Sequence, residues 1–160
     1  MPHTVIVREA ELTDAPKLAE LSGVLGYPAS ADAMAGRLER LLDREEDIIL
    51  VAEAPSIGVV GWLHASEHEL LETGRHAEIL GLVVDAEHRG SGVGRELIAR
   101  VESWAASRGL PQISVRSNVI RTESHPFYQR LGYARVKTQH AYRKALTPGR
   151  KTPSADGRAE

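Results

Sequence analysis

The stretch from Ala77 to Arg108 constrains the fold more than any other part of this sequence. It opens with Ile79 to Val84, an apolar run interrupted only by glycine, which is typical of a strand buried on both faces. A turn of small residues follows. Apolar residues then recur on one face of an expected helix, namely Val93, Leu97, Ile98, Val101, Trp104 and Ala105. The sequence therefore predicts a strand, a glycine-rich turn and a long helix in direct succession.

The turn between strand and helix predicts an anion-binding loop. Gly90, Ser91, Gly92 and Gly94 remove side-chain bulk where the first amides of the helix lack partners. Such amides bind phosphate groups, and the helix dipole adds to the attraction. The spacing fits neither the dinucleotide-binding G-x-G-x-x-G pattern nor a P-loop, which needs a lysine after its last glycine. The alternative to an anion-binding loop is a tight turn with no role in binding.

Arg89 to Gly94 forms an R-x-x-G-x-G pattern, which resembles the acyl-CoA pyrophosphate loop of the GNAT superfamily of N-acyltransferases. A second match follows, where Tyr128 precedes x-x-x-Gly132-Tyr133 in a short expected helix. Asn118 resembles the asparagine that follows the fifth strand in that family, although it stands further before the tyrosine than is usual. The resemblance covers about Val5 to Leu146.

The resemblance implies an α/β fold with one mixed sheet of about seven strands and about four helices, in which the fourth and fifth strands splay apart. The pantetheine arm of CoA would enter that gap, and loop amides would hold its pyrophosphate. Tyr128 would protonate the departing thiolate, unless it is an ordinary core residue beside Phe127. The implied cofactor-binding residues are Leu82, Val83, Val84, Arg89, Gly90, Ser91, Gly92, Val93, Gly94, Arg95 and Asn118.

The function so implied is transfer of an acetyl group from acetyl-CoA to a primary amine of a small molecule or peptide. The amine would attack directly within a ternary complex. An aliphatic amine with a pKa near 10 is almost fully protonated at pH 7, so a base must first take its proton. The alternative is a catalytically inactive acyl-CoA-binding domain with a regulatory or sensor role.

Glu78 is the candidate general base, because it is the only carboxylate on the expected central strand. Strand alternation would put it on one face with Leu80, Leu82 and Val84 unless a bulge intervenes. Otherwise it is a solvent-exposed charge at the start of the strand. Three histidines on neighbouring segments could instead accept the proton through water, namely His64, His68 and His76.

Composition narrows the class of protein. The 160 residues carry a net charge of −2, which argues against a nucleic-acid-binding surface. The chain has no cysteine, so a thiol nucleophile is excluded, and no metal site is expected. No apolar run reaches a membrane span and no signal peptide is recognisable, which predicts a cytoplasmic protein without membrane partners. A homodimer is compatible with all of this.

The resemblance implies one acetyltransferase domain over residues 1–146. The composition of residues 147–160 predicts a disordered tail. Helices are expected to begin at Thr13 or Asp14 and after Ser30, with a short one at 125–130. The further expected strands are 4–8, 47–54, 57–65, 112–116, 134–137 and 141–145.

Overall fold

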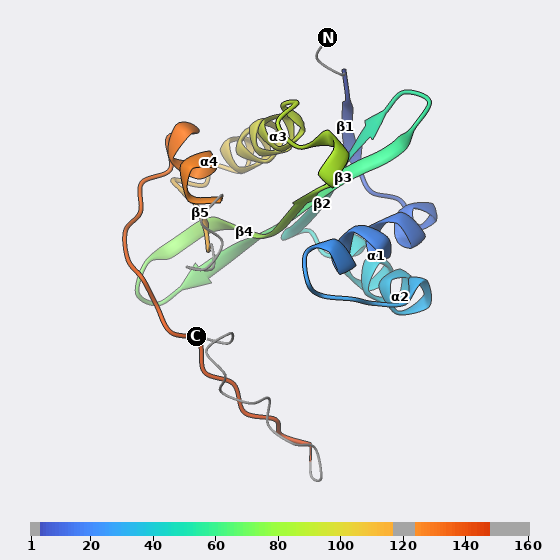
Figure 1. Cartoon of the computed structure of the whole chain (residues 1–160). Coiled ribbons are helices and arrows are strands. Elements are labelled where there is room, and N and C mark those ends of the chain that lie inside the picture. Colours follow the sequence, from blue (N-terminus) through green and yellow to red (C-terminus); the bar gives the residue numbers. More distant parts are fainter. Residues whose placement is uncertain (1–3, 117–123, 148–160) are drawn as a thin grey trace. The chain divides into compact units, whose positions relative to one another are not determined.

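The computed structural model describes residues 4–116 and 124–147. The chain divides into two compact units, an N-terminal unit of Met1–Arg116 and a C-terminal unit of Ser117–Glu160. Among the described residues, the N-terminal unit contains the sheet and three α-helices, and the C-terminal unit contains one short helix (Figure 1).

The N-terminal unit is built on one mixed sheet with the strand order β1-β2-β3-β4-β5. Neighbouring strands are antiparallel except β4 and β5, which are parallel, as the intervening helix predicts. The hairpin expected after Asp47 is confirmed, but its second strand continues past the expected end at residue 65. The strands are β1 (Ile6–Glu9), β2 (Asp47–Ala54), β3 (Gly58–Leu70), β4 (Gly74–Val84) and β5 (Ile113–Val115).

The prediction of about seven strands is not borne out, because the described residues form five. Residues 134–137 and 141–145 are described and are not strands. Residues 134–137 alternate between apolar and charged side chains and 141–145 do not, but either segment would also need a hydrogen-bonded neighbour to be a strand, which local sequence cannot supply. Their large side chains are not packed either, since Val136 is 86% exposed and Tyr142 is 92% exposed.

Helices cover both faces of the sheet. The first two are α1 (Ala15–Val24) and α2 (Ala31–Leu42), which lie on one face, and α3 (Val93–Ser107) lies on the other (Figure 1). Ser30 caps α2 as expected, because its hydroxyl accepts a hydrogen bond from Ala33 N–H at 3.0 Å. Together with α4 (Ser124–Arg130), the described chain has the expected number of α-helices.

Two separate apolar layers result from this arrangement. Leu18, Leu21 and Leu38 of α1 and α2 pack with Val51 and Val83 of the sheet. On the other face Gly61 of β3 lies under α3, where an added Cβ would come within 3.0 Å of Val83 O and 3.3 Å of a Val93 methyl group. A side chain at Gly61 would therefore push α3 away from the strand.

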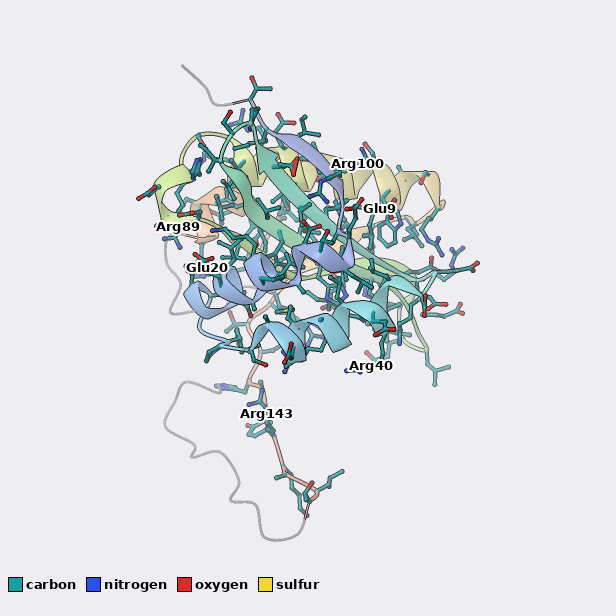
Figure 2. The ribbon with its side chains drawn as sticks, turned by 90° about the vertical axis from the view of Figure 1, so that its right-hand side faces the viewer. Glu9, Glu20, Arg40, Arg89, Arg100 and Arg143 are labelled. Atoms are coloured by element: carbon teal, nitrogen blue, oxygen red, sulfur yellow. The ribbon has the colours of Figure 1, made fainter. Side chains whose placement is uncertain are left out.

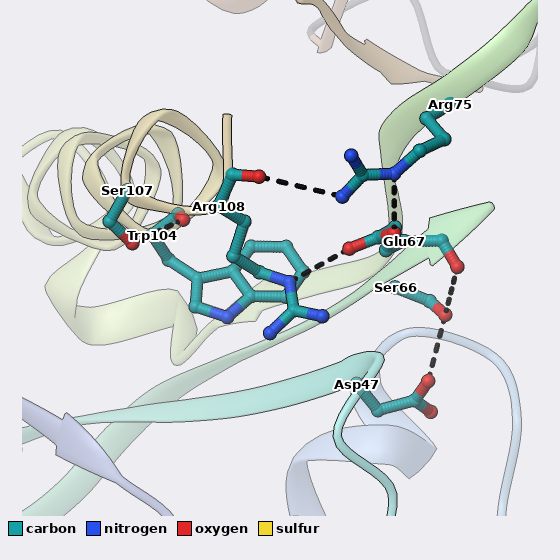
Figure 3. Close-up of polar contacts among 7 residues, drawn as sticks. All are labelled: Asp47, Ser66, Glu67, Arg75, Trp104, Ser107 and Arg108. Atoms are coloured by element: carbon teal, nitrogen blue, oxygen red, sulfur yellow. Dashed lines mark hydrogen bonds and ion pairs between the residues drawn. The ribbon is translucent and has the colours of Figure 1, made fainter. Parts of the chain in front are cut away.

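Ion pairs connect the sheet to helices on both of its faces. Arg8 of β1 donates two hydrogen bonds of 2.9 Å to the carboxylate of Asp14, which precedes α1. Burial raises the pKa of Asp14, but the hydrogen bonds from Arg8 and from Glu11 N–H outweigh burial and hold that pKa below its ordinary value. On the opposite face Glu67 binds Arg75 and Arg108, which connects the β3–β4 hairpin to the end of α3 (Figure 3).

Candidate functional site

The predicted succession of strand, turn and helix is present between β4 and α3. Asp85 follows β4, and its N–H donates to Val60 O at 2.8 Å, which continues the pairing with β3. The Asp85 carboxylate then accepts a hydrogen bond from Glu87 N–H at 3.1 Å and starts a short 3₁₀ turn, Ala86–His88. The chain reverses here and enters α3 at Val93.

The loop between that turn and α3 presents unpaired amides to open space. Gly92, the N-cap of α3, has a φ of +93°, a conformation that favours glycine. The first helical hydrogen bond runs from Glu96 N–H to Gly92 O at 3.0 Å. No hydrogen bond among the described residues is donated by the amides of Val93, Gly94 and Arg95. These three donors, together with the helix dipole, form a site that suits an anion.

Side chains hold the loop without covering its amides. Arg89 Nε donates to Val84 O at 3.3 Å, and the Ser91 hydroxyl donates to His88 O. Arg89 is exposed and lies at the turn that precedes α3 (Figure 2). A Cβ added at Gly90 or Gly92 would meet no atom within 4 Å, so the outer side of the loop is open.

The second half of β4 has one unpaired edge. On one side β4 pairs with β3 as far as Val84, which lies opposite Gly61. On the other side its pairing with β5 covers only Ala77 to Ile79. Within the described part of the N-terminal unit, no strand pairs with Leu80 to Val84 on that side. In this register Val83 turns its backbone groups toward β3, whereas those of Leu82 and Val84 point to the open edge that leads to the loop, where Val84 O accepts the hydrogen bond from Arg89.

A bulge in β4 changes which side chains share a face with Glu78. Ala65 lies opposite Ile79 whereas His64 lies opposite Gly81, so Leu80 is an extra residue in β4. Simple alternation would place Glu78 on one face with Leu80, Leu82 and Val84. Because of the bulge, Glu78 does not share their face. It shares the α1 and α2 face with Gly81 and Val83, and Leu80 is 49% exposed.

Glu78 is a buried carboxylate between two basic groups, which corrects the view of it as a solvent-exposed charge. The residue is 9% exposed. Its Oε1 lies 3.1 Å from Nε of Arg116, which follows β5, and its Oε2 lies 3.6 Å from Nε2 of His68 on β3. His68 stacks on His76, which lies directly opposite on β4, with ring centroids 5.9 Å apart. Sequence reasoning missed Arg116, because nothing local marks it as a neighbour of Glu78.

A second polar cluster lies further along the same face. Asp47 Oδ2 is 3.1 Å from His64 Nε2. Asp47 Oδ1 accepts a hydrogen bond of 2.7 Å from the Ser66 hydroxyl, which Figure 3 shows. Burial raises the pKa of Asp47, but the bonds from Ser66 and His64 and the charge of Arg44 outweigh burial and lower that pKa. Asp47 thus stays a carboxylate at neutral pH and fixes His64. As the first residue of an apolar strand, Asp47 was not recognisable from sequence.

In the C-terminal unit, Tyr128 belongs to an aromatic cluster on α4. Its ring packs edge-on against Phe127 at 5.1 Å and Tyr133 at 5.9 Å between centroids. Tyr133 N–H donates to Tyr128 O at 3.0 Å, which closes the turn after the helix as expected. Asn118 lies outside the described residues. In the N-terminal unit, Glu78, the open edge of β4 and the glycine-rich loop follow one another along the chain.

Neither a metal site nor a membrane-spanning helix is found within the described ranges 4–116 and 124–147. These residues include no group of three histidine, aspartate or glutamate side chains that could hold a metal ion. None of the helices within these ranges combines the length and the apolar character needed to span a bilayer.

The strand, loop and helix lie within a region of the chain that matches a known protein family. Residues 15–133 match the model of the acetyltransferase (GNAT) family. This match covers most of the sequence, and the chain belongs to the GNAT family of acetyltransferases.

The relatives within the family include aminoglycoside acetyltransferases. An aminoglycoside N(6′)-acetyltransferase type 1 of Stenotrophomonas maltophilia is 26% identical over 146 residues, which are 89% of this chain and 94% of that protein. An IAA acetyltransferase of Azospirillum brasilense is 28% identical over 138 residues, covering 84% of this chain and 86% of that protein. The solved structure of aminoglycoside N-acetyltransferase AAC(6′)-Iy in complex with CoA has a TM-score of 0.80 at 22% identity. The match covers 90% of this chain and 97% of the chain in that structure. It shows that the two proteins have the same fold.

Proposed function

We propose that this protein transfers the acetyl group of acetyl-CoA to a primary amine of a small molecule or peptide. The observation that carries the proposal is the row of unpaired amides at the start of α3, which adjoins the open edge of β4. A diphosphate needs several donors that converge without intervening side chains, and this loop supplies them. The family membership and the CoA complex of a protein with the same fold support the same donor.

Each part of acetyl-CoA has its own proposed binding residues. The amides from Gly90 to Arg95 hold the pyrophosphate, and Arg89 adds a positive charge beside it. The pantetheine arm contains two amide groups and lies along the backbone of Leu82, Val83 and Val84 like an added strand. Asn118, which lies outside the described residues, is proposed as a further binding residue for this arm.

The chemistry then requires a base, an oxyanion donor and an acid. Glu78 accepts the proton of the ammonium group and so frees the nitrogen lone pair for attack on the thioester carbonyl. A backbone N–H along Leu82 to Val84 donates to the tetrahedral oxyanion. Tyr128 donates its phenolic proton to the departing thiolate. A thiol has a pKa of about 8.5, so this last step needs only modest assistance.

We propose a class of acceptor amines rather than one particular compound. The relatives act on different acceptors by their names, since aminoglycoside acetyltransferases and an IAA acetyltransferase are both among them. Amine-bearing small molecules, aminoglycosides included, are therefore the first candidates. We place the acetyltransferase domain at residues 1–146 and assign no part in catalysis to residues 147–160.

The test is the release of free thiol from acetyl-CoA by the full chain across a panel of amines. The panel contains aminoglycosides, polyamines, amino acids and short peptides, and each is also offered in N-acetylated form as a matched control. We expect one class to raise thiol release well above the rate without amine, and its blocked form to have no effect. Tight acetyl-CoA binding without turnover on any amine would contradict the proposal and favour a sensor domain.

A further inference from the structure

Glu78 has little direct contact with water through which to lose a proton. Its side chain is 12% exposed, and its two carboxylate oxygens face Arg116 and His68. A guanidinium group has donors only and stays protonated at ordinary pH, so Arg116 cannot take a proton. Of the two groups that contact the carboxylate, only the imidazole has a nitrogen lone pair to offer.

His68 connects this buried carboxylate to solvent. Its Nε2 is buried, lies 3.6 Å from Glu78 Oε2 and makes no hydrogen bond within the described part of the chain. The side chain as a whole is nevertheless 36% exposed, so its other atoms are in contact with water. Stacking on His76 holds the ring in this orientation. The 3.6 Å contact is somewhat longer than a hydrogen bond, and contacts of catalytic groups commonly tighten when substrate binds.

We propose that His68 is the proton exit of Glu78. This inference rests on the proposed function, in which Glu78 takes the proton of the acceptor amine. The O–H bond of the protonated Glu78 breaks and a new N–H bond forms at His68 Nε2. The imidazolium then releases its Nδ1 proton to water, and solvent exchange restores the starting tautomer. The net result is one proton moved from the buried carboxyl to solvent in each turnover.

The groups that face the His68 ring are the Glu78 carboxylate, 3.6 Å from its Nε2, and the stacked ring of His76. Arg116 contacts the other oxygen of the same carboxylate at 3.1 Å. Further titratable or charged groups on this face include His64 on the same strand, Asp47 of β2 and Arg44, which precedes β2.

The test compares His68→Gln with the unchanged protein in weak buffer at saturating acetyl-CoA and acceptor. Glutamine keeps a polar side chain but cannot carry a proton, so we expect kcat to fall about tenfold with little change in either KM. Added imidazole should restore kcat in proportion to its concentration, which a purely structural role would not do. His140→Gln makes the same exchange at an exposed histidine of the C-terminal unit and controls for the substitution and for imidazole itself.

Melting temperatures of the variants show whether they fold. A folded His68→Gln protein with the kcat of the unchanged chain would overturn the proton exit and leave the proposed function standing. So would a loss of kcat that imidazole does not restore. If His64→Gln shows the loss and the rescue instead, the proton leaves through the pair of His64 and Asp47, and the assignment to His68 is wrong. No turnover by the unchanged protein on any amine would overturn the proposed function and the proton exit together.

Discussion

Replacement of Gly92 by valine should separate the binding role of the loop from its structural role. Gly92 has a φ of +93°, and an L-residue in this region costs about 1–2 kcal/mol. No atom lies within 4 Å of the added Cβ, so no clash with the protein adds to that cost. The side chain instead occupies the open side of the loop, where the pyrophosphate would approach the amides. We expect acetyl-CoA to bind at least tenfold more weakly, which corresponds to about 1.4 kcal/mol.

The same helix offers a matched control. Gly109 follows α3 at its other end, has a φ of +73°, and likewise has no atom within 4 Å of an added Cβ. Gly109→Val should therefore lose a similar amount of unfolding free energy, about 1–2 kcal/mol in a urea titration. Calorimetric titration with acetyl-CoA should show weakened binding for Gly92→Val alone. Unchanged affinity in a folded Gly92→Val protein, or an equal loss in Gly109→Val, would refute the assignment of the loop.

Three further predictions concern other parts of the chain. The pKa of Asp14 is lowered, so the stability from its pair with Arg8 is present above about pH 4 and fades as the pH falls through the folded value. Asp14→Asn should thus lower the unfolding free energy by about 2 kcal/mol at pH 7 and by less near pH 2; urea titrations with an equal loss at both values would contradict this. Tyr128→Phe should lower kcat about 10-fold to 10³-fold with acetyl-CoA affinity nearly unchanged, and an unchanged kcat with chemistry rate-limiting would remove Tyr128 from the mechanism. Removal of residues 147–160 should shift the melting temperature by less than about 4 °C; a larger fall would show that this segment is packed.

Local sequence patterns predicted the part of the candidate site that lies within one continuous stretch of the chain. The apolar run before the loop, the glycines and the one-sided periodicity after them lie within one continuous stretch, and the structure has strand, loop and helix in that order. Ser30 at the start of α2 was predictable for the same reason, since a cap involves residues only a few positions apart.

The parts that were not predicted depend on pairing between distant segments. The bulge at Leu80 is visible only in the register of β3 against β4, and it decides which face Glu78 occupies. Arg116 and His68 reach the Glu78 carboxylate because three strands align there. The strands expected at 134–137 and 141–145 are absent for a related reason, because the sequence of a segment says nothing of the strand it would pair with.

The most direct test of the central claim follows the acetyl group itself. The full chain is incubated with acetyl-CoA labelled with ¹³C in the acetyl group and with the amine that gives the fastest thiol release. Mass spectrometry of the acceptor and of the intact protein then locates the label. Direct transfer predicts the label on the amine, in equal amount to the thiol released, with the protein unlabelled. Thiol release without a labelled amine, or label retained on the protein, would contradict it.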